Sequence, residues 1–89
     1  MQVFKQNRGQ VSQIIDQRMR PMALNGKEIM VMHLQVEWSG EQEEDKDRFS
    51  WEPLARMNRD VPQMVLEYCQ ATGLNLEKTL DDEANKRGN

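Results

Sequence analysis

Residues 30–38 restrict the fold of this chain most, because every second residue in this run is apolar. The apolar positions are Met30, Met32, Leu34, Val36 and Trp38, with His33, Gln35 and Glu37 between them. A period of two indicates a β-strand with one buried face, whereas a helix would repeat every three to four residues. We therefore predict a strand over residues 28–38, with the even-numbered side chains in the core. His33 is expected on the surface of the sheet and not in a metal or catalytic site.

A first strand is predicted upstream, over residues 11–19. Its apolar residues are Val11, Ile14, Ile15 and Met19. Their spacing fits a helix as well as a strand, but β-branched side chains favour an extended backbone. Gly9 and Pro21 flank the run. We expect a bent strand with a bulge near Ile14.

Turns and a charged loop separate the strands. Asn25-Gly26 combines two residues that tolerate positive φ, which predicts a type I′ turn. Residues 21–24 are expected to widen this connection into a loop. Residues 41–47 are too charged to be buried, and a third strand is predicted at 48–51.

Pro53 lacks an N–H group and is expected to end the third strand. Asp60 is then interpreted as the N-cap of a helix, with Pro62 in its first turn. The apolar stripe of this helix consists of Met64, Val65, Tyr68 and Cys69. Gly73 is predicted to end the helix.

Length and composition limit the class of protein. A chain of 89 residues suffices for one small domain. The longest apolar run, residues 29–32, is too short for a transmembrane helix, and no secretory leader is expected after Met1. The single cysteine, Cys69, excludes an internal disulfide and a cysteine-rich zinc site. We expect an intracellular compartment and an inert, buried thiol.

Charge is unevenly distributed, although the net charge of the chain is only −3. Residues 1–27 hold five cations against Asp16. A weak, accessory nucleic-acid contact through Lys5, Arg8, Arg18, Arg20 and Lys27 is one interpretation. No tryptophan or tyrosine accompanies these cations for base stacking. The acidic residues 41–47 are either a solvated loop tip or a surface for a basic tail.

Together these segments predict an α+β domain, a three-stranded curved antiparallel sheet packed by one C-terminal helix. The predicted organisation is a flexible segment over 1–8, the domain over 9–73 and a polar tail over 74–89. The tail either frays or forms a short helix over about 75–85. A sheet of three strands with one apolar face needs a helix to cover it.

Four segments, taken in order, resemble the chromodomain family. They are residues 11–18 (VSQIIDQR), 34–40 (LQVEWSG), 50–53 (SWEP) and 61–68 (VPQMVLEY). The matching region spans residues 9–72. Trp51-Glu52-Pro53 followed by residues 60–62 is also similar to chromodomains at the end of retrotransposon integrases. The resemblance implies an SH3-like small barrel.

The resemblance also implies that a histone tail or another extended peptide adds to the domain as a strand. In the family, methyl-lysine then enters a cage of three aromatic side chains. Trp38 matches one wall, whereas Gly9 and Glu41 stand where the other two aromatics are expected. Phe4 and Phe49 are the candidate substitutes. The implied peptide-binding set is Trp38, Glu41, Phe4, Phe49, Gly9, Trp51 and Glu52.

An alternative interpretation is a degenerate chromodomain that serves as a protein-interaction or homodimer module, for example to target a retroelement integrase. Its interface would use Met64, Leu66 and Tyr68 of the helix. No paired nucleophile and base, metal cluster or phosphate loop is apparent, so we expect no enzyme, no cofactor and no metal. The resemblance implies nuclear chromatin as the location, with a plastid as the alternative, and no membrane partner.

Overall fold

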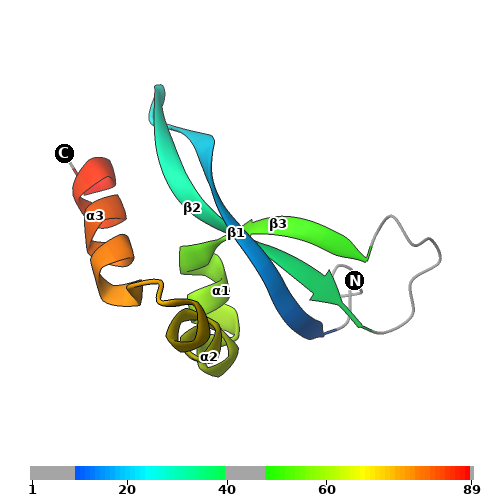
Figure 1. Cartoon of the computed structure of the whole chain (residues 1–89). Coiled ribbons are helices and arrows are strands. Elements are labelled where there is room, and N and C mark those ends of the chain that lie inside the picture. Colours follow the sequence, from blue (N-terminus) through cyan, green and yellow to red (C-terminus); the bar gives the residue numbers. More distant parts are fainter. Residues whose placement is uncertain (1–9, 40–47, 89) are drawn as a thin grey trace.

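The computed structural model describes residues 10–39 and 48–88. It contains one three-stranded antiparallel sheet, in the order β1-β2-β3, followed by three helices (Figure 1). The strands are β1 (Val11–Leu24), β2 (Lys27–Trp38) and β3 (Phe49–Pro53); the helices are α1 (Leu54–Asp60), α2 (Pro62–Thr72) and α3 (Leu76–Gly88). The predicted α+β class and curved antiparallel sheet are confirmed. Three helices follow the sheet: α2 is the predicted covering helix, α3 corresponds to the alternative of a short helix over about 75–85, and α1 was not predicted.

The hairpin of β1 and β2 is longer than the sequence predicts. Asn25-Gly26 has φ values of 53° and 79°, which confirms the tight turn. Residues 21–24 are not a widened loop, since Pro21 pairs with Met30 inside the strand. The Met30 carbonyl accepts a hydrogen bond from Lys86 Nζ of α3 at 3.3 Å, on the side away from β1. Pro21 therefore occupies a non-hydrogen-bonded pair, and its missing N–H costs no ladder bond.

The sheet is bent, and its third strand is short. Register shifts on both sides of Ile14 confirm the bulged strand β1. β3 extends to Pro53, beyond the predicted boundary, and pairs with β2 from His33 to Glu37. Residues 27–32 of β2 therefore run past the end of β3.

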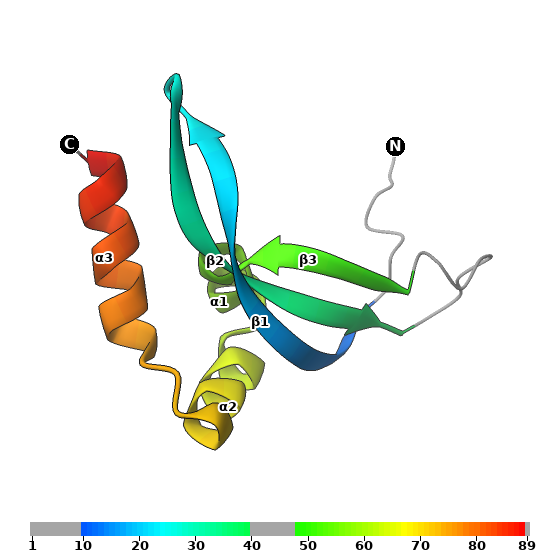
Figure 2. The same ribbon diagram turned by 45° about the horizontal axis from the view of Figure 1, so that its top comes forward.

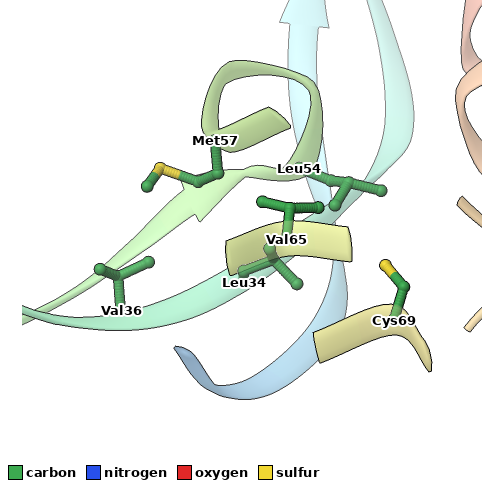
Figure 3. Packing of buried hydrophobic residues seen from close by; sticks show 6 residues of the cluster. All are labelled: Leu34, Val36, Leu54, Met57, Val65 and Cys69. Carbon is green, nitrogen blue, oxygen red and sulfur yellow. The ribbon is translucent and has the colours of Figure 1, made fainter. Parts of the chain in front are cut away.

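The core lies between one face of β2 and the first two helices (Figure 3). Its buried members are Leu34, Val36, Leu54, Met57, Val65 and Cys69. Burying one such aliphatic side chain contributes about 1.5–3 kcal/mol. The predicted inward face of β2 is thus confirmed at Leu34 and Val36, and the predicted helix stripe at Val65 and Cys69.

Helix α1 is the element that sequence analysis misses. The prediction that Asp60 caps the following helix is wrong: Asp60 is the last residue of α1, and Val61 precedes α2 without a side-chain cap. α1 buries Leu54 and Met57, a single apolar turn that gives no clear period. Gly73, with φ of 83°, ends α2 as predicted.

The face of β2 that is buried changes along the strand. Met30, predicted in the core, is 44% exposed, whereas Val31 is fully buried and His33 is only 8% exposed. His33 has β-strand neighbours on both sides, Arg18 and Pro53, and its Nδ1 lies 2.9 Å from the Val31 carbonyl oxygen. A side chain on a central strand is covered by its cross-strand neighbours. The predicted surface position of His33 is therefore wrong.

Helix α3 lies beside the β1–β2 hairpin (Figure 2) and closes the part of β2 that β3 leaves unpaired. The Met32 amide donates to Glu83 Oε2 at 2.8 Å, next to the Lys86 contact at Met30. Two side chains of a helix thus replace the acceptor and the donor of a missing strand. Asn75, the residue before this helix, caps its first turn: its side-chain Oδ1 accepts a hydrogen bond from the Lys78 amide.

Replacing Glu83 with Ala should uncover the Met32 amide. Hydrogen bonds to charged groups contribute about 1.5–3 kcal/mol, so exchange of this amide should become roughly ten- to a hundredfold faster. Amide hydrogen exchange followed by NMR measures the effect. Asp81→Ala, an exposed change on the same helix, is the control. Unchanged protection of Met32 in Glu83→Ala would contradict the proposed edge closure.

Candidate functional site

A hollow of about 520 Å³ lies between the start of β1, the end of β2 and the junction of α1 with α2. Its lining residues are Gln10, Val11, Trp38, Met57, Asp60, Val61 and Met64. The volume is within the usual range for pockets that take a ligand or a side chain. We call this hollow the Trp38 groove.

Trp38 is the last residue of β2, and its ring is half-buried against the core. The indole Nε1 donates a hydrogen bond to Ser50 Oγ at 2.8 Å, and Ser50 in turn donates to Glu52 at 2.7 Å. Arg56 donates to the same carboxylate at 3.3 Å. This chain of hydrogen bonds fixes the plane of the indole, so the wall of the groove is pre-formed. The role of Ser50 was not predicted from the sequence.

The groove is apolar apart from a few groups. Among the lining residues that the structure describes, Asp60 carries the charge, and its carboxylate is about half exposed beside Arg59. Met57 and Met64 supply flexible, polarisable walls. An indole, a carboxylate and thioethers around one hollow suit a cationic group on an apolar shaft. This wall was not predicted from the sequence, because Asp60 was interpreted as a helix cap.

The other predicted cage residues do not join Trp38 here. Phe49 pairs with Glu37, and Trp51 pairs with Gln35, so both lie on the face of the sheet opposite Trp38. Glu52 is linked to the indole through Ser50. Phe4, Gly9 and Glu41 lie outside the described residues, as do the segment 1–8 that was predicted to be flexible and the acidic residues 41–47.

The three residues of the predicted dimer face have different environments. Met64 lines the Trp38 groove, and Leu66 is 41% exposed. Tyr68 packs against the core, and its hydroxyl donates to Gln17 Oε1 of β1 at 3.0 Å. These side chains therefore do not form one continuous apolar surface.

The predicted nucleic-acid residues that the structure describes fall into two groups. The guanidinium carbons of Arg18 and Arg20 lie 4.8 and 5.8 Å from the centre of the Trp51 ring. Lys27 is exposed at the start of β2. Lys5 and Arg8 are outside the described residues.

Cys69 is buried as predicted, and burial raises the pKa of its thiol above the ordinary 9.0. Burial also raises the pKa of the Tyr68 phenol above 10.0, with smaller contributions from the charges of Asp16 and Cys69. Both groups are therefore neutral near pH 7. Cys69 lacks the thiolate character that a reactive cysteine requires.

Two further findings concern classes of ligand. Within residues 10–39 and 48–88, no group of three or more histidine, cysteine or acidic side chains is arranged to hold a metal ion. In the same part of the chain, no helix combines the length and apolar character needed to cross a bilayer.

Comparisons of the chain with models of protein families, with curated proteins and with solved structures find no match. The function is therefore inferred from the geometry of the site.

The raised pKa values of Cys69 and Tyr68 predict a loss of stability in alkali. The folded state holds both protons more tightly than the unfolded chain, so this contribution is complete below about pH 9 and falls as the pH rises further. In Cys69→Ala the fall should be shallower, since one of the two groups is removed. Urea unfolding between about pH 7 and pH 10.5 measures both slopes, with the exposed change Gln70→Ala as control. Equal slopes in wild type and Cys69→Ala would refute this assignment.

Proposed function

We propose that this chain is a peptide-binding module of the chromodomain type, which holds an extended, lysine-bearing peptide such as a histone tail. The observation that carries the proposal is the Trp38 groove, where an indole and the Asp60 carboxylate line one apolar hollow. The sequence resemblance and the curved three-stranded sheet agree with it. Nuclear chromatin is the setting in which such peptides are abundant.

The peptide backbone would bind by strand addition. β1 is an edge strand of the described sheet, and its first residue, Val11, lines the groove and pairs with Trp38. An extended peptide along this edge gains main-chain hydrogen bonds that do not depend on its sequence. Side chains on one face of the peptide would then point toward the groove.

The lysine side chain would supply the specificity. Its ammonium, methylated or not, is attracted to the face of an indole and to a carboxylate. Met57 and Met64 adapt to the width of the alkyl shaft. Since one aromatic wall is available among the described residues, we expect methylation to change the affinity by a modest factor. Each cation–π contact contributes about 0.5–2 kcal/mol, or roughly two- to thirtyfold.

Asp60→Asn should weaken binding of a histone-tail peptide severalfold without lowering stability. The C-terminal end of a helix carries a partial negative charge, so the Asp60 carboxylate at the end of α1 interacts unfavourably with the helix dipole. Removing its charge therefore does not destabilise the helix. Backbone amide shifts in a titration with the same peptide, unmodified and trimethylated on one lysine, give both affinities. Asp81→Asn on α3 removes the same charge far from the groove and should leave them unchanged. Equal loss in both variants would point to general electrostatics instead of a site.

Trp38→Ala should abolish the difference in affinity between the trimethylated and the unmodified peptide. Trp38→Phe keeps an aromatic face but loses the hydrogen bond to Ser50, and should retain part of the difference. The largest amide shifts in wild type are expected near Val11, Trp38 and Val61. Dispersed amide spectra must first establish that each variant is folded. A folded Trp38→Ala variant with wild-type affinities would exclude the groove as the lysine site.

A further inference from the structure

We propose that the part of the sheet around Phe49 and Trp51, on the face opposite the Trp38 groove, binds single-stranded nucleic acid. The proposal goes beyond peptide binding and uses different residues. It is carried by the side chains of Phe49 and Trp51 on β3 and of Arg18 and Arg20 on β1.

Phe49 and Trp51 stand on the face of the sheet that α1 and α2 leave uncovered. They pair with Glu37 and Gln35 of β2, whose side chains alternate with the buried Leu34 and Val36. Phe49 is 44% exposed, and Trp51 is half-buried. Two residues along one strand place the rings about 7 Å apart. At such a spacing one base of an extended single strand can stack on Phe49, and the next can stack on the guanidinium plane that lies over Trp51.

The two arginines lie over the ring of Trp51. Arg18 and Arg20 are exposed, and their guanidinium carbons lie 4.8 and 5.8 Å from the centre of the Trp51 ring. A guanidinium beside an aromatic ring retains N–H groups that bind phosphate in a bidentate manner. Aromatic rings next to arginines are what single-strand binding surfaces combine.

Positive charge continues along the hairpin. A hollow of about 130 Å³ between the hairpin tip and the end of α3 is lined by Lys27, Lys86 and Arg87. Lys27 lies four residues before Val31, the cross-strand partner of Arg20, or about 13 Å further along the same strand face. This length corresponds to about two nucleotides of an extended chain.

Acidic residues on this face limit the expected affinity. Glu37 accepts a hydrogen bond from Gln13, and its carboxylate lies 4.0 Å from Arg48 Nε. Asp16 accepts from the Gln17 amide beside it. Because the net charge of the whole chain is −3, we expect weak binding with a clear salt dependence.

The aromatic pair decides between the classes of ligand. A nucleic-acid duplex or an acidic peptide could bind to the positive charge of the arginines, but neither presents unstacked bases to Phe49 and Trp51. Single strands expose these base faces, and sheet surfaces with aromatic side chains bind them by stacking.

Fluorescence anisotropy of a labelled single strand of about twelve nucleotides tests the proposal at low salt. Phe49→Ser should weaken binding about tenfold, in keeping with the loss of one stacked base. The double variant Arg18→Gln, Arg20→Gln should reduce the slope of log affinity against log salt by about 1.4, since each single-strand phosphate contact contributes about 0.7. The matched controls are Leu66→Ser and the double variant Arg59→Gln, Lys78→Gln, which change exposed helix residues.

Four outcomes would overturn the proposal. These are the absence of binding, equal affinity for a duplex, full displacement by a polyglutamate peptide, and equal losses in the control variants. Asp60→Asn should leave the affinity for the single strand unchanged, because Asp60 lines the groove on the other side of the sheet. Failure of peptide binding is therefore distinguishable from failure of this proposal.

Discussion

Leu34 and Val36 are fully buried on β2, the central strand of the described sheet. The helices pack around these two side chains. α1 begins directly after β3 and therefore packs on the sheet near the end of that strand. There it contributes Leu54 and Met57 to the core. α2 returns across the same face. Trp38 shares this face but lies at the end of β2, beside the junction of the two helices. The groove is therefore a consequence of how far the helical cover extends along β2.

The short third strand imposes a second requirement. Where β3 ends, the backbone of β2 would present unpaired groups, and buried unpaired groups are costly. Glu83 Oε2 accepts a hydrogen bond from the Met32 amide. The other oxygen of this carboxylate, Oε1, is buried without a partner among the described residues. The polar C-terminal segment thus has a structural role, and β2 is protected from pairing with other chains.

Sequence patterns predict those parts of the fold that depend on local chemistry. The Asn25-Gly26 turn, the bulge near Ile14 and the Gly73 helix end all follow from the conformational preferences of single residues. α1 could not be predicted, because its helical state depends on burying two side chains against β2. His33 has the same explanation: a polar side chain is buried there by neighbours from two other strands. For the candidate site, Trp38 was identified from its motif, whereas Asp60 and Ser50 join it only through tertiary structure.

The two tryptophans lie on opposite faces of the sheet, and the register of β2 against β3 determines this. In the pairing of β2 with β3, even-numbered residues face even-numbered ones and odd face odd. Trp38 and Trp51, thirteen residues apart, therefore lie on opposite faces. A register shifted by one residue would place both on one face, with Phe49 beside Trp38 as a second wall of the cage. The pairing register of β2 with β3 fixes this parity, and an aromatic motif read along the chain carries no information about it. Trp38 therefore lines the groove on the face that the helices cover, whereas Trp51 belongs to the aromatic, arginine-bearing surface on the opposite face.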